Sequence, residues 1–105
     1  MFARKLEFDL MLIKKEEFLR KVRDEVLPIL KKQAGFIDIL GLTDELKVEK
    51  TLLISLWDTK EHALKYEKEV FPKITVLLKP YQLTPMVVTP CVVETTISEH
   101  ILAVA

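Results

Sequence analysis

The fold is decided by residues 52–71, LLISLWDTKEHALKYEKEVF. The first six of these residues are almost all apolar, and an apolar run without alternation is typical of a strand buried on both faces. We expect this strand to extend over residues 48–57. Asp58 or Thr59 then caps a helix, and Glu61 follows Asp58 at the spacing of a capping box. The expected buried stripe of this helix comprises Ala63, Tyr66 and Val70, with His62 as a further candidate.

Two strands and a helix are expected before this stretch. Residues 2–12 alternate between apolar and charged side chains, which predicts a strand with one buried face. The period then becomes helical until Gly35, which supplies the left-handed residue that ends a helix. Pro28 lies inside this helix and predicts a kink or a loosened turn. Residues 36–42 form the next expected strand.

A short helix and a last strand are expected after it. Pro72 interrupts the second helix and can begin another over residues 73–79, because a proline in the first turn loses no helical hydrogen bond. Residues 86–98 are rich in Val and Thr and predict the last strand, in which Pro90 implies a bulge or an edge position. The apolar tail, residues 101–105, is expected to dock on another surface.

The order strand, helix, strand, strand, helix, strand predicts an α+β protein of the ferredoxin-like βαββαβ type. Its four-stranded antiparallel sheet carries both helices on one face, and residues 1–105 form a single domain. Two helices cover only one face, yet the third and last strands are apolar on both. We therefore expect the second face to meet the same face of another copy, in a homodimer through the sheet faces.

The composition excludes several function classes. Sixteen Lys and Arg balance sixteen Asp and Glu, so no nucleic-acid partner is expected. Apolar runs are too short to span a membrane, and acidic residues near the start argue against a signal peptide, which favours the cytoplasm. One Cys and two distant His give no disulfide framework and no metal site, and a glycine-rich phosphate loop is absent.

The whole chain resembles the antibiotic-biosynthesis-monooxygenase-like (ABM) members of the dimeric α+β barrel superfamily. Residues 16–36, EEFLRKVRDEVLPILKKQAGF, are similar to the family's long helix and its Pro/Ala-Gly-Phe turn into the second strand. Residues 52–71 are similar to its third strand, which ends at an aromatic residue and an acidic-Ser/Thr cap. The resemblance implies a dimeric α+β barrel. For an enzyme, it implies a cofactor-independent monooxygenase that acts on a small aromatic or quinol-type compound.

The catalytic sets of the characterised family members are not reproduced in this chain. Haem-degrading members rely on an Asn in the first strand, and this chain contains no Asn. Phenol-oxidising members look similar at Trp57 but place an Asn where this chain has Leu53. Quinol-oxidising members carry histidines late in the second helix, where this chain has Tyr66 and Val70. The alternative function is a non-catalytic small-molecule-binding or accessory homodimer.

Trp57, His62 and Tyr66 are the candidate catalytic residues. His62 and Tyr66 lie four residues apart and share a helix face, and Trp57 ends the strand that leads into this helix. Together they could line a pocket for a small apolar or aromatic ligand, where His62 deprotonates a phenol and the carbanion reacts with O2. The other interpretation of the same three residues is plain core packing.

Four further residues carry reactive groups, and each has a structural interpretation. Asp9 alternates with other charged residues, which indicates a solvated or interface position. Asp38 lies among apolar neighbours, which favours a buried ion pair with Arg4 or a lysine over catalysis. Cys91 is expected to be an inert residue in an apolar strand. His100, in the tail, is expected to be exposed or at the dimer contact.

Overall fold

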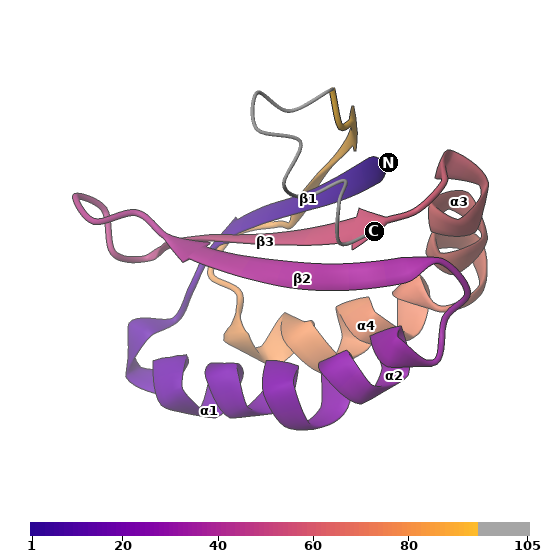
Figure 1. The fold of residues 1–105 in the computed structure, drawn as a ribbon. Helices are drawn as coiled ribbons and strands as arrows, with labels where there is room; N and C mark the ends of the chain where they lie inside the picture. The colour runs from indigo at the N-terminus through magenta and orange to yellow at the C-terminus, as the bar shows by residue number, and fades with distance from the viewer. Residues whose placement is uncertain (95–105) are drawn as a thin grey trace.

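Four antiparallel strands form one sheet in the order β2-β3-β1-β4 (Figure 1). They are β1 (Phe2–Asp9), β2 (Phe36–Thr43), β3 (Lys50–Trp57) and β4 (Val87–Val92). The computed structural model describes residues 1–94, so the expectations for residues 95–98, for His100 and for the tail lie outside the described part. The order and directions of the strands confirm the predicted ferredoxin-like α+β fold.

The helices cover one face of the sheet and one of its ends. Figure 1 shows α1, α2 and α4 beneath the sheet, while α3 stands beside the end at which β3 stops. Their bounds are α1 (Lys15–Lys21), η2 (Val22–Val26), α2 (Leu27–Lys31), α3 (Lys60–Glu69) and α4 (Phe71–Leu78), with short turns η1 (Leu12–Lys14) and η3 (Lys79–Tyr81). Within residues 1–94, no helix has the length and apolar character needed to cross a membrane.

The core lies between the helices and the inner face of the sheet. The register pairs Phe2 with Trp57, Leu6 with Leu53 and Phe8 with Thr51, and all six side chains are buried. The predicted alternation of β1 is therefore confirmed. The other parity of β3 is only half-buried, so within residues 1–94 the helices cover one face of this strand and leave the second open.

The opposite side of the sheet, which we call the outer face, carries an apolar surface. Its position follows from the register, because residues that alternate with the buried ones point away from the helices. The large apolar residues of the outer face are Leu40, Leu42, Leu52, Ile54, Leu56 and Val87. Leu40, Leu42 and Val87 are exposed, and the three residues from β3 are half-buried.

The expected disturbance near Pro28 is present as a turn of π-helix. Residues Val22–Val26 adopt this wider form, and the N–H of Leu27 donates to the carbonyl of Val22. Pro28 follows directly in α2, which continues from the π turn, so its missing N–H leaves one helical hydrogen bond unmade. Gly35 has a φ of 81°, as the predicted left-handed helix end requires.

Thr59, and not Asp58, caps α3. The Thr59 Oγ1 atom accepts a hydrogen bond from the N–H of His62 at 3.2 Å. Asp58 instead uses its carboxylate to bind the imidazole of the same histidine. Pro72 lies in the first turn of α4, which confirms that this proline begins a new helix.

Asp38 does not form the predicted buried ion pair. A bulge between Phe36 and Asp38 shifts the register, and Asp38 is exposed with its Oδ1 atom accepting from the N–H of Ile39 at 2.8 Å. Among the described residues, the only partner of β4 is β1, which confirms the edge position expected for Pro90. Cys91 is half-buried, and its Sγ atom lies 3.7 Å from the carbonyl of Thr89.

Candidate functional site

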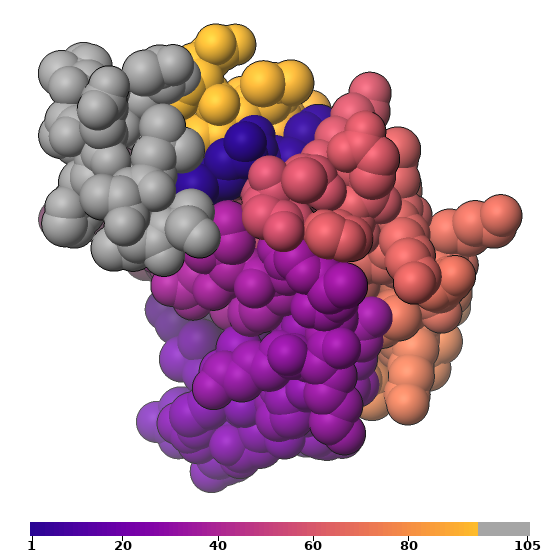
Figure 2. Space-filling view, turned by 45° about the vertical axis from the view of Figure 1, so that its right-hand side comes forward, coloured from indigo at the N-terminus to yellow at the C-terminus, as the bar shows by residue number. Residues whose placement is uncertain are grey.

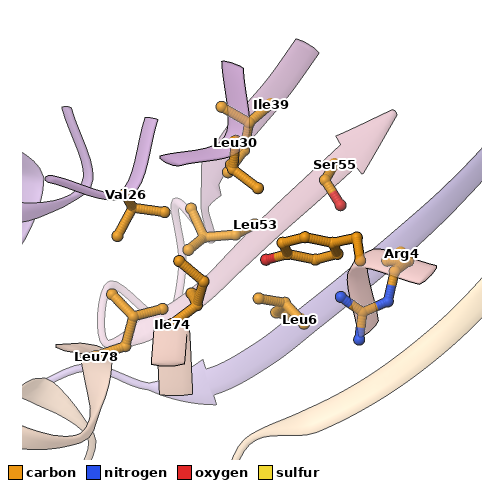
Figure 3. Close-up of a pocket in the computed structure, with 10 residues that line it drawn as sticks. Arg4, Leu6, Val26, Leu30, Ile39, Leu53, Ser55, Ile74 and Leu78 are labelled. Atoms are coloured by element: carbon orange, nitrogen blue, oxygen red, sulfur yellow. The ribbon is translucent and has the colours of Figure 1, made fainter. Parts of the chain in front are cut away.

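A small enclosed cavity lies between the inner face of the sheet and the helices, and we call it the inner cavity. Its volume is about 10 Å³, which is room for one water molecule. In Figure 3, Arg4 and Ser55 lie at one end of the cavity, while Val26 and Leu78 lie at the other. The lining residues are Arg4, Leu6, Val26, Leu30, Ile39, Leu53, Ser55, Tyr66, Ile74 and Leu78.

Arg4 is the charged residue of the inner cavity. It lies on β1 between Phe2 and Leu6, with the parity that points to the helices, and only 2% of it is exposed. Its guanidinium carbon lies 4.2 Å from the centre of the Phe71 ring and 5.2 Å from that of Tyr66. Such contacts stabilise a cation through the ring electrons.

The hydrogen bonding of Arg4 is incomplete. Its Nη2 atom is buried and has no hydrogen-bond partner among residues 1–94. The nearest carboxylate oxygen is Glu67 Oε1 at 3.8 Å, on a side chain that is half-exposed. Burial lowers the pKa of Arg4 from its ordinary value, and the neighbouring Tyr66 and Glu67 partly offset this effect. The guanidinium nevertheless stays charged, because arginine is not deprotonated in proteins.

Tyr66 and Trp57 meet beside Arg4. Their ring centroids are 4.7 Å apart, and both residues are buried. Trp57 donates its indole N–H to Ser55 Oγ at 3.0 Å, which turns this hydroxyl into an acceptor on one side. Burial raises the pKa of Tyr66 to about 12, although the positive charge of Arg4 opposes this effect. The phenol of Tyr66 is therefore neutral and able to donate a hydrogen bond at physiological pH.

His62 lies apart from the inner cavity. Its Nδ1 atom is 2.7 Å from Asp58 Oδ1, and 39% of its side chain is exposed. This hydrogen bond holds the pKa of Asp58 below its ordinary value. His62 lines an open surface recess of about 240 Å³ together with Lys32, Gln33, Ala34, Lys65, Tyr66 and Glu69. The structure thus brings Trp57 and Tyr66 together and leaves His62 in a recess that shares only Tyr66 with the cavity.

An apolar groove adjoins the inner cavity. It has a volume of about 240 Å³ and lies between β2 and the helical segment from α1 to α2. Gly41 lies on the inner side of β2 and brings no side chain to the groove, which leaves room there. The groove is lined by Phe18, Leu19, Val22, Arg23, Leu27, Ile39, Gly41 and Leu53. Ile39 and Leu53 also line the inner cavity, so these two side chains form the wall between the two spaces.

Arg4 and Ser55 are the polar site residues that the sequence analysis missed. Arg4 was considered only as a partner for Asp38. The signal was present in the sequence, because Arg4 shares its parity with Phe2, Leu6 and Phe8 and is therefore a charged residue in a buried row. A cation at such a position needs either a partner or a ligand.

The arrangement is suited to stabilising negative charge on a bound molecule. A guanidinium and a neutral phenol border one small space, and hydrogen-bond donors aimed at a developing oxyanion act strongly where water is excluded. Over the described part of the chain, no three His, Cys, Asp or Glu residues gather as metal ligands would.

Solved structures are similar to this chain in fold. They include SnoaB, a cofactor-independent oxygenase from Streptomyces nogalater, at 12% identity and a TM-score of 0.70, with 91% of this chain and 95% of that chain covered. A putative antibiotic biosynthesis monooxygenase from Deinococcus radiodurans is 14% identical at a TM-score of 0.71, covering 92% and 96%. A conserved protein from Methanosarcina mazei Go1 is 16% identical at a TM-score of 0.70, covering 90% and 94%. Neither a protein-family model nor a curated protein matches the sequence.

These similarities concern the backbone. Several of the similar structures are named as antibiotic biosynthesis monooxygenases or putative ones, which confirms for the fold the resemblance drawn from residues 16–36 and 52–71. The sequence identities in these comparisons are 16% or less, so the role of a residue in one protein cannot be assigned to a residue of this chain. The chemistry of this chain therefore has to be argued from its own cavity.

Proposed function

We propose that the protein is a cofactor-independent monooxygenase that acts on a small aromatic or quinol-type compound bound at the inner cavity. The observation that carries the proposal is the buried guanidinium of Arg4 beside the neutral phenol of Tyr66, in a space otherwise lined by Ser55 and apolar side chains. A fold similar to that of a structure named as a cofactor-independent oxygenase supports it.

The proposed reaction needs a stabilised anion. The bound phenol loses its proton, and the resulting phenolate is stabilised by the charge of Arg4. Its electron-rich ring carbon then reduces O2 and forms a bond to one oxygen atom, which gives a hydroperoxide. Loss of water leaves a quinone, so one oxygen atom stays in the product and the other leaves as water.

His62, Tyr66 and Trp57 keep distinct roles in this proposal. Tyr66 presents its ring to the cavity, where an aromatic substrate would stack, and Trp57 packs against Tyr66 without lining the cavity. His62 is the candidate base. The proton of the bound phenol would have to travel from the inner cavity to the recess of His62, and Tyr66 borders both spaces. A His62→Ala variant that folds and keeps full turnover would remove His62 from the mechanism.

Oxygen consumption tests the proposal directly. The protein is mixed with a panel of naphthols and naphthoquinols, and labelled O2 is traced into the quinone product. We expect Tyr66→Ala to lower turnover by about 100-fold or more, because it removes the aromatic wall of the site. Leu64→Ala, on the exposed side of α3, should leave turnover unchanged. No oxygen uptake with any member of the panel would refute the proposed reaction.

A non-catalytic binding or accessory role is the second candidate, because a cavity this filled by side chains argues against turnover. At about 10 Å³, the inner cavity holds no aromatic ring unless its side chains move. Native mass spectrometry separates the two candidates when combined with the oxygen assay. A reproducible small adduct without oxygen uptake would support the binding role.

We also propose that two copies associate through their outer faces. The six large apolar residues on this face form a surface that, among the described elements, no helix or strand covers. Burial of apolar area at about 25 cal/mol per Å² favours such a contact. A two-fold arrangement brings the same apolar surface of each copy together.

A further inference from the structure

We propose that the inner cavity and the apolar groove together bind a carboxylate that has an apolar body. The carboxylate is received by Arg4, and the body lies along the groove beside β2. This ligand class goes beyond the oxygenase reaction and does not depend on it. A phenol that also carries a carboxylate would satisfy both proposals.

The first argument is the state of Arg4. Buried charges in proteins are paired or hydrogen-bonded, because removing a charge from water is costly. Arg4 Nη2 is buried without a hydrogen-bond partner in residues 1–94, and Glu67 Oε1 at 3.8 Å is too distant for a hydrogen bond. The planar guanidinium matches a carboxylate with two parallel hydrogen bonds. A carboxylate would therefore satisfy the donor that the protein leaves open.

The second argument is the placement of the groups around the guanidinium. Phe71 covers one face of Arg4 at 4.2 Å, which fixes the plane and leaves the edge of the guanidinium for a ligand. Ser55 Oγ accepts from Trp57, so its own hydrogen remains available to donate. Ser55 and Tyr66 border the same cavity as Arg4 and offer two neutral donors.

The third argument is the charge of the walls. Among residues 1–94, no acidic side chain lines the inner cavity or the groove, whereas each space contains one arginine. Arg23 stands at the groove, where two-thirds of its side chain is exposed and its Nε atom is 3.1 Å from Asp24 Oδ1. The deep end thus holds a buried cation whose ion-pair partner among residues 1–94 is the half-exposed Glu67 at 3.8 Å, and the groove is apolar apart from Arg23.

The fourth argument is continuity between the two spaces. Ile39 and Leu53 are the side chains shared by both linings, so rotating them joins the inner cavity of about 10 Å³ to the groove of about 240 Å³. Both are aliphatic residues whose rotamers can change without breaking a hydrogen bond. The joined space has a cationic inner end and an apolar outer length, which is the shape of a carboxylate with an apolar body.

Titration calorimetry with octanoate and octan-1-ol tests the proposal on the full chain. Octanoate should bind at least about 10-fold more tightly than the alcohol, because a hydrogen bond to a charged group is worth that much or more. Arg4→Gln should weaken octanoate binding by about 10- to 100-fold. Arg20→Gln removes an exposed arginine that lines neither the inner cavity nor the groove, and it should change the affinity by less than about 3-fold.

Two further variants and the oxygen assay test the proposal even if Arg4→Gln does not fold. If Arg4→Gln does not fold, Arg4→Lys should fold and still lose the two-point hydrogen bond, and Ser55→Ala should weaken octanoate binding alone. Equal binding of acid and alcohol, equal effects of the two Gln variants, or no octanoate binding would each overturn the proposal. Octanoate binding without oxygen uptake from phenols would refute only the oxygenase reaction.

Discussion

At the scale of single residues, Arg4 loses its hydration on folding and gains contacts with the rings of Phe71 and Tyr66 and with the carboxylate of Glu67. The effective cost of burying a charge is several kcal/mol, whereas a desolvated contact between a cation and an aromatic ring returns about 2 kcal/mol. The contact with Glu67 at 3.8 Å involves a half-exposed partner and adds little. The two ring contacts together offset much of this cost, and we expect the buried charge to remain a net cost to the ligand-free protein.

The replacement Arg4→Met tests this balance. Methionine keeps the unbranched apolar stem of the side chain but removes the buried guanidinium and its charge. We expect the free energy of unfolding of the ligand-free protein to rise by about 1–4 kcal/mol, measured by urea denaturation. Arg23→Met, at an exposed position, should change it by less than about 0.5 kcal/mol. A clear loss of stability in Arg4→Met would instead assign Arg4 a structural role.

Tyr66 predicts how stability depends on alkaline pH. Its pKa is raised from 10.0 to about 12 in the folded protein by burial, so the folded state keeps the phenol proton after the unfolded chain loses it. The contribution is complete below pH 10 and is lost as the pH rises towards 12. Wild type should therefore lose about 2 kcal/mol more than Tyr66→Phe between pH 10 and pH 12, because each pKa unit corresponds to about 1.4 kcal/mol and the folded-state phenol is itself half-ionised near pH 12. The free energy of unfolding of both proteins is measured by urea denaturation at each pH. Equal losses of stability in the two proteins would contradict a buried Tyr66 phenol.

At the scale of elements, the turn after α2 is joined to the start of α3. The carbonyl of Gly35 accepts from the N–H of Asp58 at 2.9 Å, and the pair formed by Asp58 and His62 lies directly against Gly35. Figure 2 shows the turn after α2 and the segment between β3 and α3 in contact on the surface. This junction gives His62 a structural role independent of chemistry.

Gly35→Ala is the variant that tests the junction. A Cβ atom at this φ of 81° would collide with Asp58 Oδ1 and with Nδ1 and Cβ of His62. We expect a loss of about 1–3 kcal/mol in unfolding free energy, from backbone strain and displacement of the pair. Gly41→Ala is the control, since its Cβ would make an ordinary contact with Leu53 Cδ2 at 3.6 Å. A Gly35→Ala protein as stable as its control would show that the junction adapts.

The regular elements could be predicted from the sequence because their signals are local. The alternation of β1, the left-handed Gly35 and the helix starting near Pro72 depend on near neighbours in the chain. The position of Pro28 predicted a loosened turn but not that this turn would be π-helical, since a π turn depends on how the helix packs. Asp38 was misplaced because a bulge in β2 reversed its face, and a bulge leaves no mark in the pattern of apolar residues.

The candidate site was less predictable than the fold. Trp57 and Tyr66 were expected to meet, and they do, since the stripe of α3 faces the end of β3. His62 was expected beside them, but its side chain turns to Asp58 four residues earlier. Arg4 lies far from all three in sequence, so only the pairing of β1 with β3 brings it to Ser55 and the cavity.

At the scale of the whole molecule, the outer face predicts the assembly state. Leu40→Glu places a charge on the outer face, whereas Leu64→Glu places one on α3 at a similar exposure, 52% against 47%. Light scattering should give a dimer for wild type and for Leu64→Glu, and a monomer for Leu40→Glu, because a buried unpaired charge disfavours association. A monomeric wild type, or dissociation of both variants, would refute association through this face.

Pro90 affects how copies of this chain can assemble into larger oligomers. As an edge-strand residue of β4 it offers no N–H, so a foreign strand laid along that edge would form an interrupted ladder. Edge-to-edge addition could repeat without end and produce fibres, whereas pairing of faces closes after two copies. Pro90 thus disfavours the edge-to-edge pairing of strands that would allow open-ended polymerisation of a protein with an apolar sheet face.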